Sequence, residues 1–136
     1  MAVTQRLRRH VIERADNRCE YCQMPAEYDV AHFEVDHVRP QVHDGQTVSE
    51  NLAWACFRCN NGKGPNLAGI DAHTDQLAPL FHPRREDWDE HFEWAGPHLL
   101  GKSPTGRATI AVLKINAPSR ITLRQQLIEE GVFPPA

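Results

Sequence analysis

The chain has 136 residues, of which 40% are hydrophobic, so it can form one domain with a modest core or one small domain with an extension. Its formal net charge of −3 at pH 7 argues weakly against a nucleic-acid partner, although basic residues are concentrated near both ends. No uninterrupted apolar run is long enough to span a membrane, and the first residues form no apolar signal segment, so we expect a cytoplasmic protein.

The N-terminal half of the sequence predicts a helix followed by two short strands. Apolar residues recur at helical spacing over residues 5–15, and Thr4 is a suitable N-cap. Alternating β-prone residues predict a strand over residues 33–38. A polar loop over residues 41–50 then leads to a second short strand, predicted over residues 51–55.

The sequence after Cys56 has less regular patterns, and its elements are predicted from capping and breaking residues. A short helix is expected after Cys56, because glycine and proline stop it a few residues later. Residues 66–90 are rich in Pro, Asp and His and are expected to be irregular. A small hairpin is predicted over residues 92–100, a helix over residues 103–114 and a last helix over residues 118–131.

Two CxxC pairs frame the middle of the chain: Cys19 with Cys22, and Cys56 with Cys59. Four thiolates at this spacing can complete a tetrahedral zinc site with no further ligand. Disulfides are the alternative, but a two-residue spacer would make strained, redox-active bonds. A thiol redox protein is a weaker alternative, because neither pair has the strand-to-helix context of a thioredoxin. We therefore expect a structural zinc ion.

Zinc would leave four polar residues available for other chemistry: Asp36, His37, Asn51 and Asn60. Phosphodiester hydrolysis needs a water deprotonated near neutral pH and a cation at the scissile phosphate. The imidazole of His37 suits the first task, and the carboxylate of Asp36 suits a hard divalent ion. The amide oxygen of Asn60 can serve the same ion, and Asn51 can hold the loop backbone. The alternatives are a surface or core Asp-His pair and asparagines that only cap a turn or a helix.

These residues resemble the HNH endonucleases of the ββα-metal type. The resembling motifs lie between about residues 15 and 65: Cys19-x2-Cys22, Val35-Asp36-His37-Val38-x-Pro40, Asn51-Leu52 and Cys56-x2-Cys59-Asn60-x2-Lys63. The resemblance implies that Asp36 and Asn60 bind a catalytic Mg²⁺ or Mn²⁺, that His37 is the general base, and that Asn51 braces the site. Asn60 stands where the family usually has histidine, so the sequence resembles the HNN variant.

We therefore predict an α+β protein. Residues 1–66 are expected to form an N-terminal helix and a zinc-stapled ββα-metal core, and residues 67–136 an extension with a hairpin and two helices that packs on the core. The predicted function is metal-dependent hydrolysis of DNA, with RNA as the alternative substrate. The alternative is a non-catalytic, zinc-dependent nucleic-acid-binding module. Nucleic-acid contacts are assigned to four basic residues: Arg58, Lys63, Arg120 and Arg124. The alternatives are a solvated side chain for Lys63, and plain core packing for the helices that carry Arg120 and Arg124.

Overall fold

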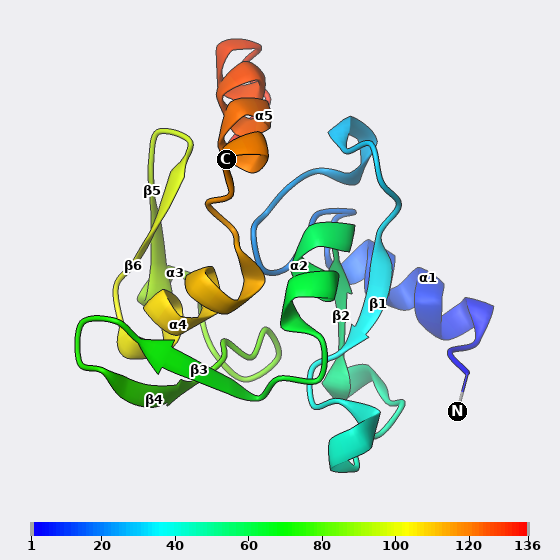
Figure 1. Ribbon diagram of the computed structural model, residues 1–136. Coiled ribbons are helices and arrows are strands. Elements are labelled where there is room, and N and C mark those ends of the chain that lie inside the picture. Colours follow the sequence, from blue (N-terminus) through cyan, green and yellow to red (C-terminus); the bar gives the residue numbers. More distant parts are fainter. Residues whose placement is uncertain (1, 136) are drawn as a thin grey trace.

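Residues 2–135 of the computed structural model form five α-helices and three separate two-stranded antiparallel sheets (Figure 1). Short 3-10 turns cover Ala26–Tyr28, Gln41–His43 and Ser49–Asn51. The mixture of helices and small antiparallel sheets confirms the α+β prediction. None of the helices in this part of the chain combines the length and the apolar character that crossing a bilayer requires.

The N-terminal half contains the predicted ββα unit. Helix α1 (Gln5–Arg14) begins where the Thr4 side chain accepts a hydrogen bond from the Leu7 N–H at 3.1 Å. Strand β1 (Glu34–His37) pairs with β2 (Leu52–Ala55), and α2 (Phe57–Lys63) follows directly. Helix α1 packs against β2, and α2 packs against β1. All four elements lie where the sequence predicts them, within a few residues at each end.

The segment expected to be irregular contains a hairpin instead. Strands β3 (Ala68–Asp71) and β4 (Gln76–Pro79) pair antiparallel, so the prediction for residues 66–90 is wrong in this part. The hairpin forms because it packs on α4 (Pro104–Leu113), which begins 25 residues after the end of β4. Gly69 permits this contact, since a Cβ atom there would lie 2.5 Å from a methyl carbon of Val112. The local sequence carries no signal of this contact.

The last hairpin and the last two helices follow the prediction closely. A short helix α3 (Trp88–His91), which the sequence did not predict, precedes the hairpin of β5 (Phe92–Ala95) and β6 (His98–Gly101). Helix α4 begins at the N-cap Ser103, whose hydroxyl accepts the Gly106 N–H at 3.0 Å. Helix α5 (Pro118–Glu129) ends the fold. Helix α4 also packs against α2, and a single buried apolar cluster includes residues from both sides of position 66.

Two arginines of α5 are buried, which contradicts their assignment as nucleic-acid contacts. Arg124 is 0% exposed, and its guanidinium donates to the carbonyl oxygens of Pro97 at 2.8 Å and Ile115 at 3.0 Å. Arg120 donates two hydrogen bonds to the Asp29 carboxylate, at 3.0 and 2.8 Å. Both charges therefore hold loops against α5, and the prediction that they contact DNA is wrong.

The β3–β4 hairpin is attached to α4 by a buried carboxylate. Arg107 donates to both oxygens of Asp71, at 2.7 and 3.0 Å. The Asp71 oxygens also accept the His73 N–H and the Thr74 hydroxyl. The hydrogen bonds from Arg107 hold the pKa of Asp71 well below its ordinary value, against the opposing effect of burial.

We expect Asp71→Asn to unfold at a lower temperature than the wild type at pH 7. A carboxylate with a lowered folded-state pKa stabilises the fold above its ordinary pKa of about 3.9 and loses that contribution as the pH falls below it. The difference in unfolding temperature should therefore shrink as the pH is lowered through about 4. Thermal unfolding followed by circular dichroism measures this. The control is Asp75→Asn in the exposed turn, and an equal effect of the two substitutions would contradict the prediction.

Candidate active site

The four cysteines are brought together by the turn before β1 and by the start of α2. All four are buried and free of disulfides, and their sulfur atoms lie within 4.8 Å of one another. The Cys22 and Cys56 sulfurs are 3.8 Å apart. A tetrahedral zinc ion with Zn–S bonds of about 2.3 Å separates its sulfurs by roughly 3.8 Å. The arrangement therefore fits the donor set and the size of a structural zinc site.

Backbone N–H groups point at two of the four sulfurs, where they favour negative charge. The Cys22 N–H points to the Cys19 sulfur at 3.5 Å, and the Cys59 N–H points to the Cys56 sulfur at 3.3 Å. Burial nevertheless raises the pKa of the Cys19 thiol well above its ordinary value. Four buried thiolates are therefore stable only with a cation among them, and a zinc ion would supply that positive charge.

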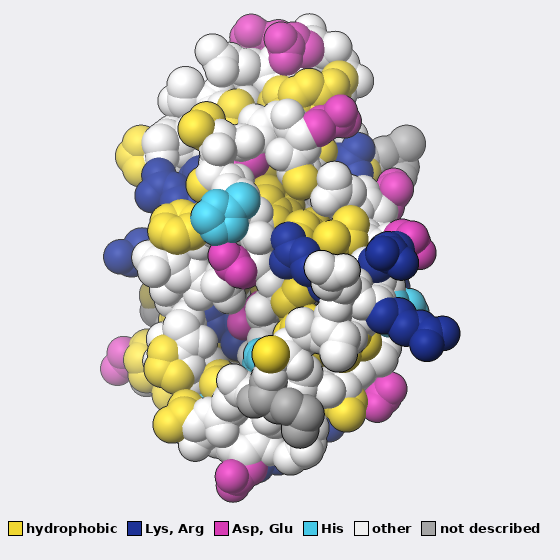
Figure 2. Space-filling model, turned by 90° about the vertical axis from the view of Figure 1, so that its right-hand side faces the viewer, with side chains coloured by type: hydrophobic (Ala, Val, Ile, Leu, Met, Phe, Trp, Pro, Cys, Tyr) yellow, Lys and Arg dark blue, Asp and Glu magenta, His cyan; other side chains and the backbone are white. Residues whose placement is uncertain are grey.

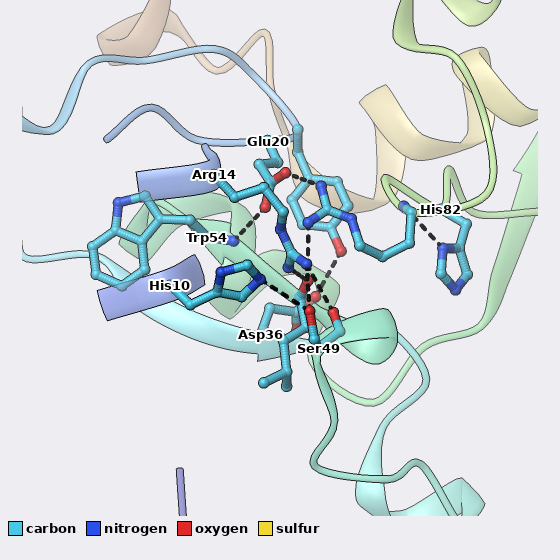
Figure 3. Close-up of polar contacts among 10 residues, drawn as sticks. His10, Arg14, Glu20, Asp36, Ser49, Trp54 and His82 are labelled. Carbon is cyan, nitrogen blue, oxygen red and sulfur yellow. Dashed lines mark hydrogen bonds and ion pairs between the residues drawn. The ribbon is translucent and has the colours of Figure 1, made fainter. Parts of the chain in front are cut away.

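The first cysteine pair is fixed to β2 by its middle residues. The Glu20 N–H donates to the Trp54 carbonyl at 2.8 Å, and the Trp54 N–H donates to the Glu20 carboxylate at 2.8 Å. Arg84, from the C-terminal extension, forms an ion pair with the other Glu20 oxygen. Figure 3 shows these contacts of Glu20 together with Arg14, which reaches Ser49 from α1. Segments from both halves of the chain thus converge on the turn that carries Cys19 and Cys22.

Three predicted site residues line one surface hollow. Asp36 and His37 come from the end of β1, and Asn60 comes from α2. Neighbours in an ideal strand point to opposite faces. Here the strand ends at His37, and both residues border the hollow next to Pro40. Asp36 and Asn60 offer a carboxylate and an amide, which are ligand types that suit a hard divalent cation.

Asn51 fastens the loop that follows β1. Its side-chain oxygen accepts the Arg39 N–H at 2.9 Å, and its side-chain nitrogen donates to the Arg39 carbonyl at 3.0 Å and to the Gln46 carbonyl at 2.9 Å. In addition, the Val38 N–H donates to the Asn51 carbonyl at 2.9 Å. Asn51 therefore holds the two residues that come directly after His37, which is the geometry that a bracing role requires.

His37 is held by a residue that the sequence did not point to. Its Nε2 atom lies 2.9 Å from the Thr47 hydroxyl oxygen. Partial burial lowers the pKa of His37, and the negative charge of Asp36 acts in the opposite direction. A lowered pKa keeps the imidazole neutral at neutral pH, and only the neutral form accepts a proton. Thr47 lies in a polar loop without any motif, so no local signal marks it.

Lys63 is buried and pairs with Asp36, which contradicts its assignment as a phosphate contact. The side chain is 1% exposed, and its Nζ atom lies 3.3 Å from Asp36 Oδ1 and 3.0 Å from the His37 carbonyl oxygen. The three-residue spacing between Asn60 and Lys63 on a helix is a signal that they share a face. Burial raises the pKa of Asp36, with Lys63 as the largest opposing influence.

Arg58 is exposed and donates to the Ser119 hydroxyl, so its assignment stays a prediction.

Comparison with known proteins decides the family. Residues 19–66 match the family model described as HNH endonuclease. This part of the chain is an HNH endonuclease domain. The matched residues include all four cysteines and the Asp36, His37, Asn51 and Asn60 set. The resemblance read from the sequence is therefore confirmed, as is the ββα arrangement that carries the cysteine cluster.

Two curated proteins are similar to this chain, over different shares of its length. Septu protein PtuB of Bacillus thuringiensis is 28% identical over 120 residues, which cover 87% of this chain and 44% of that protein. The CRISPR-associated endonuclease Cas9 of Corynebacterium diphtheriae is 36% identical over 67 residues, which cover 48% of this chain and 6% of that protein. The chain thus spans less than half the length of either relative. No solved structure matches the chain significantly.

Proposed function

We propose that the protein is a metal-dependent endonuclease that hydrolyses phosphodiester bonds of DNA, with His37 as the general base. The observation that carries this proposal is the hollow of the HNH domain that Asp36, His37 and Asn60 line together. Binding of nucleic acid alone does not need an acid, a base and an amide at one point. Hydrolysis does, because a proton has to leave the attacking water while charge develops on the phosphate.

Two metal sites belong to this proposal. The four cysteines would hold a structural Zn²⁺, since a complete set of thiolates leaves no open position for a water. Asp36 and Asn60 would hold Mg²⁺ or Mn²⁺ at the hollow. When bound, that ion supplies a positive charge for the phosphate oxygens. Because Lys63 already donates to Asp36 Oδ1, an incoming ion has to share this oxygen with the ammonium group or displace it.

The protein's own contribution is to place and orient one base. Thr47 engages Nε2 of His37, which leaves the Nδ1 atom to accept the proton of the attacking water. Asn51 holds the backbone that follows His37, so the imidazole keeps its position relative to the hollow. A base oriented in this way increases the hydrolysis rate roughly 10²- to 10⁴-fold.

DNA is proposed as the substrate because of basic side chains that stay exposed. Arg58 lies next to the cysteine cluster in α2, and Arg6, Arg8 and Arg9 are exposed on α1. In Figure 2, Lys and Arg side chains lie at the left, centre and right of one face, with acidic side chains among them as well as at its top and bottom. Contacts of this kind position a phosphate backbone without reading its sequence.

The ion pair between Lys63 and Asp36 favours the second candidate, a non-catalytic nucleic-acid-binding module. A carboxylate that is already paired and 5% exposed is less available to a metal. One experiment separates the two functions. Zinc-loaded protein is incubated with supercoiled plasmid, single-stranded DNA and RNA, with and without Mg²⁺ or Mn²⁺. A nuclease gives nicked or shortened products only with the added ion, whereas a binding module retards the nucleic acid in a gel and leaves it intact.

A further inference from the structure

A tyrosine inside the first CxxC pair contacts the carboxylate of the candidate active site. Tyr21 stands between Cys19 and Cys22, is 0% exposed, and donates its hydroxyl to Asp36 Oδ2 at 2.6 Å. This distance is typical of a hydrogen bond to a charged oxygen. Asp36 therefore has both oxygens engaged, Oδ2 by Tyr21 and Oδ1 by Lys63. Figure 3 shows a hydrogen bond that ends on the Asp36 carboxylate.

The backbone of Tyr21 is held independently of its hydroxyl. The indole N–H of Trp88 donates to the Tyr21 carbonyl at 2.9 Å, and the preceding residue is bonded to β2 through the Glu20 N–H. On its other side, the Gln23 N–H donates to the Cys19 carbonyl at 2.8 Å, which closes the turn that carries the two sulfurs. The position of the hydroxyl thus follows from the shape of the cysteine turn.

The two hydrogen bonds to the Asp36 carboxylate differ in how readily a metal ion could replace the donor. A buried carboxylate oxygen without a donor costs free energy, so Oδ2 needs the Tyr21 hydroxyl. That bond is short, whereas the Lys63 contact at Oδ1 is 3.3 Å long. Oδ1 is therefore the oxygen from which an entering ion can displace a partner. A ligand whose orientation is fixed in advance binds a metal more tightly than a mobile one.

We propose that Tyr21 is a positioning residue that links the cysteine turn to the catalytic carboxylate. It fixes the rotamer of Asp36 and reserves Oδ1 for the divalent ion. The four-cysteine site then has a second role besides stabilising the fold, because an ordered turn is the condition for an ordered Asp36. This inference rests on the proposed function, since it assigns a role to a residue that supports the proposed metal ligand.

The test is Mn²⁺ binding by zinc-loaded protein, measured from the electron paramagnetic resonance signal of free Mn²⁺. Tyr21→Phe removes only the hydroxyl and keeps the ring in the core. Tyr28→Phe is the matched control, because it removes the hydroxyl of the other tyrosine, which is exposed. Asp36→Ala identifies the Mn²⁺ that binds at the proposed site. Zinc content and the unfolding temperature are measured for each variant.

We expect Tyr21→Phe to keep its zinc and to raise the Mn²⁺ dissociation constant about 10- to 100-fold, as losses of outer partners of metal ligands usually do. Tyr28→Phe should bind Mn²⁺ as the wild type does. Wild-type affinity in Tyr21→Phe, with binding that Asp36→Ala abolishes, would overturn this inference and leave the proposed function intact. Wild-type protein without an Asp36-dependent Mn²⁺ site would overturn both.

A second measurement covers the case in which Tyr21→Phe does not fold. Wild-type protein is produced with 3-fluorotyrosine at both tyrosines, and the two fluorine resonances are assigned with the Tyr28→Phe protein. Adding Mg²⁺ should shift the Tyr21 resonance and leave that of Tyr28 in place, and Asp36→Ala should abolish the shift. An unmoved Tyr21 resonance at saturating Mg²⁺ would show that the hydroxyl is not connected to the ion, and the inference would be wrong.

Discussion

His37→Ala is expected to lower the cleavage rate about 10²- to 10⁴-fold, which is the usual contribution of a general base. The fold should persist, because the imidazole is only half-buried and its hydrogen-bond partner Thr47 lies in a loop. Affinity for DNA should change little, since the base acts on the transition state more than on the bound substrate. Cleavage is measured under single-turnover conditions at saturating protein, and DNA binding by fluorescence anisotropy.

His32→Ala is the control for this prediction. His32 is an exposed histidine shortly before β1, where it pairs with Glu34 at 2.9 Å. Its removal should leave the cleavage rate within about twofold of the wild type, because a single exposed ion pair contributes little. If His37→Ala and His32→Ala cut DNA at the same rate, His37 is not the base.

Cys59→Ser should release the structural zinc and unfold the core. Zinc sites of this kind contribute on the order of 10 kcal/mol, which is comparable with the whole stability of a small domain. The effect should be large here because the cluster joins the turn before β1 to α2, the two segments that carry Tyr21 and Asn60. Zinc content and near-ultraviolet circular dichroism report the loss.

The neighbouring substitution Asn61→Ser provides the control for that loss. Asn61 is exposed, lies two residues beyond Cys59 in the same helix, and contributes no sulfur to the cluster. It should keep one zinc per chain and unfold near the wild-type temperature. A Cys59→Ser protein that is zinc-free and yet folds as stably as the wild type would contradict the role assigned to the cysteine cluster.

The parts of the fold that the sequence predicts are those with a local signal. Thr4 and Ser103 accept backbone hydrogen bonds at the starts of α1 and α4, as their positions before helical segments indicate. The paired cysteines meet because the two-residue spacer already sets the local turn. The β3–β4 hairpin was missed because the groups that attach it, Asp71 and Arg107, are 36 positions apart.

The basic residues that were wrongly predicted at the surface are buried for one physical reason. Lys63 and Arg124 carry charges, which usually stay in water, and were therefore expected at the surface. The structure buries them, because Lys63 meets Asp36 and a carbonyl oxygen, and Arg124 meets carbonyl oxygens from two loops. Such partners lie far away in the sequence, so the burial of a single basic residue has no local signature. Tyr21 was missed for the same reason, since its contact with Asp36 spans 15 positions.

The central claim is that the hollow lined by Asp36, His37 and Asn60 is a metal-dependent nuclease site. The most direct test is the rate of plasmid cleavage by zinc-loaded protein as a function of added Mn²⁺, measured side by side for the wild type and Asp36→Ala. We predict that the wild-type rate rises with Mn²⁺ to saturation and that Asp36→Ala shows no such rise at the same concentrations. Cleavage without added metal, or an identical Mn²⁺ dependence in both proteins, would contradict the account.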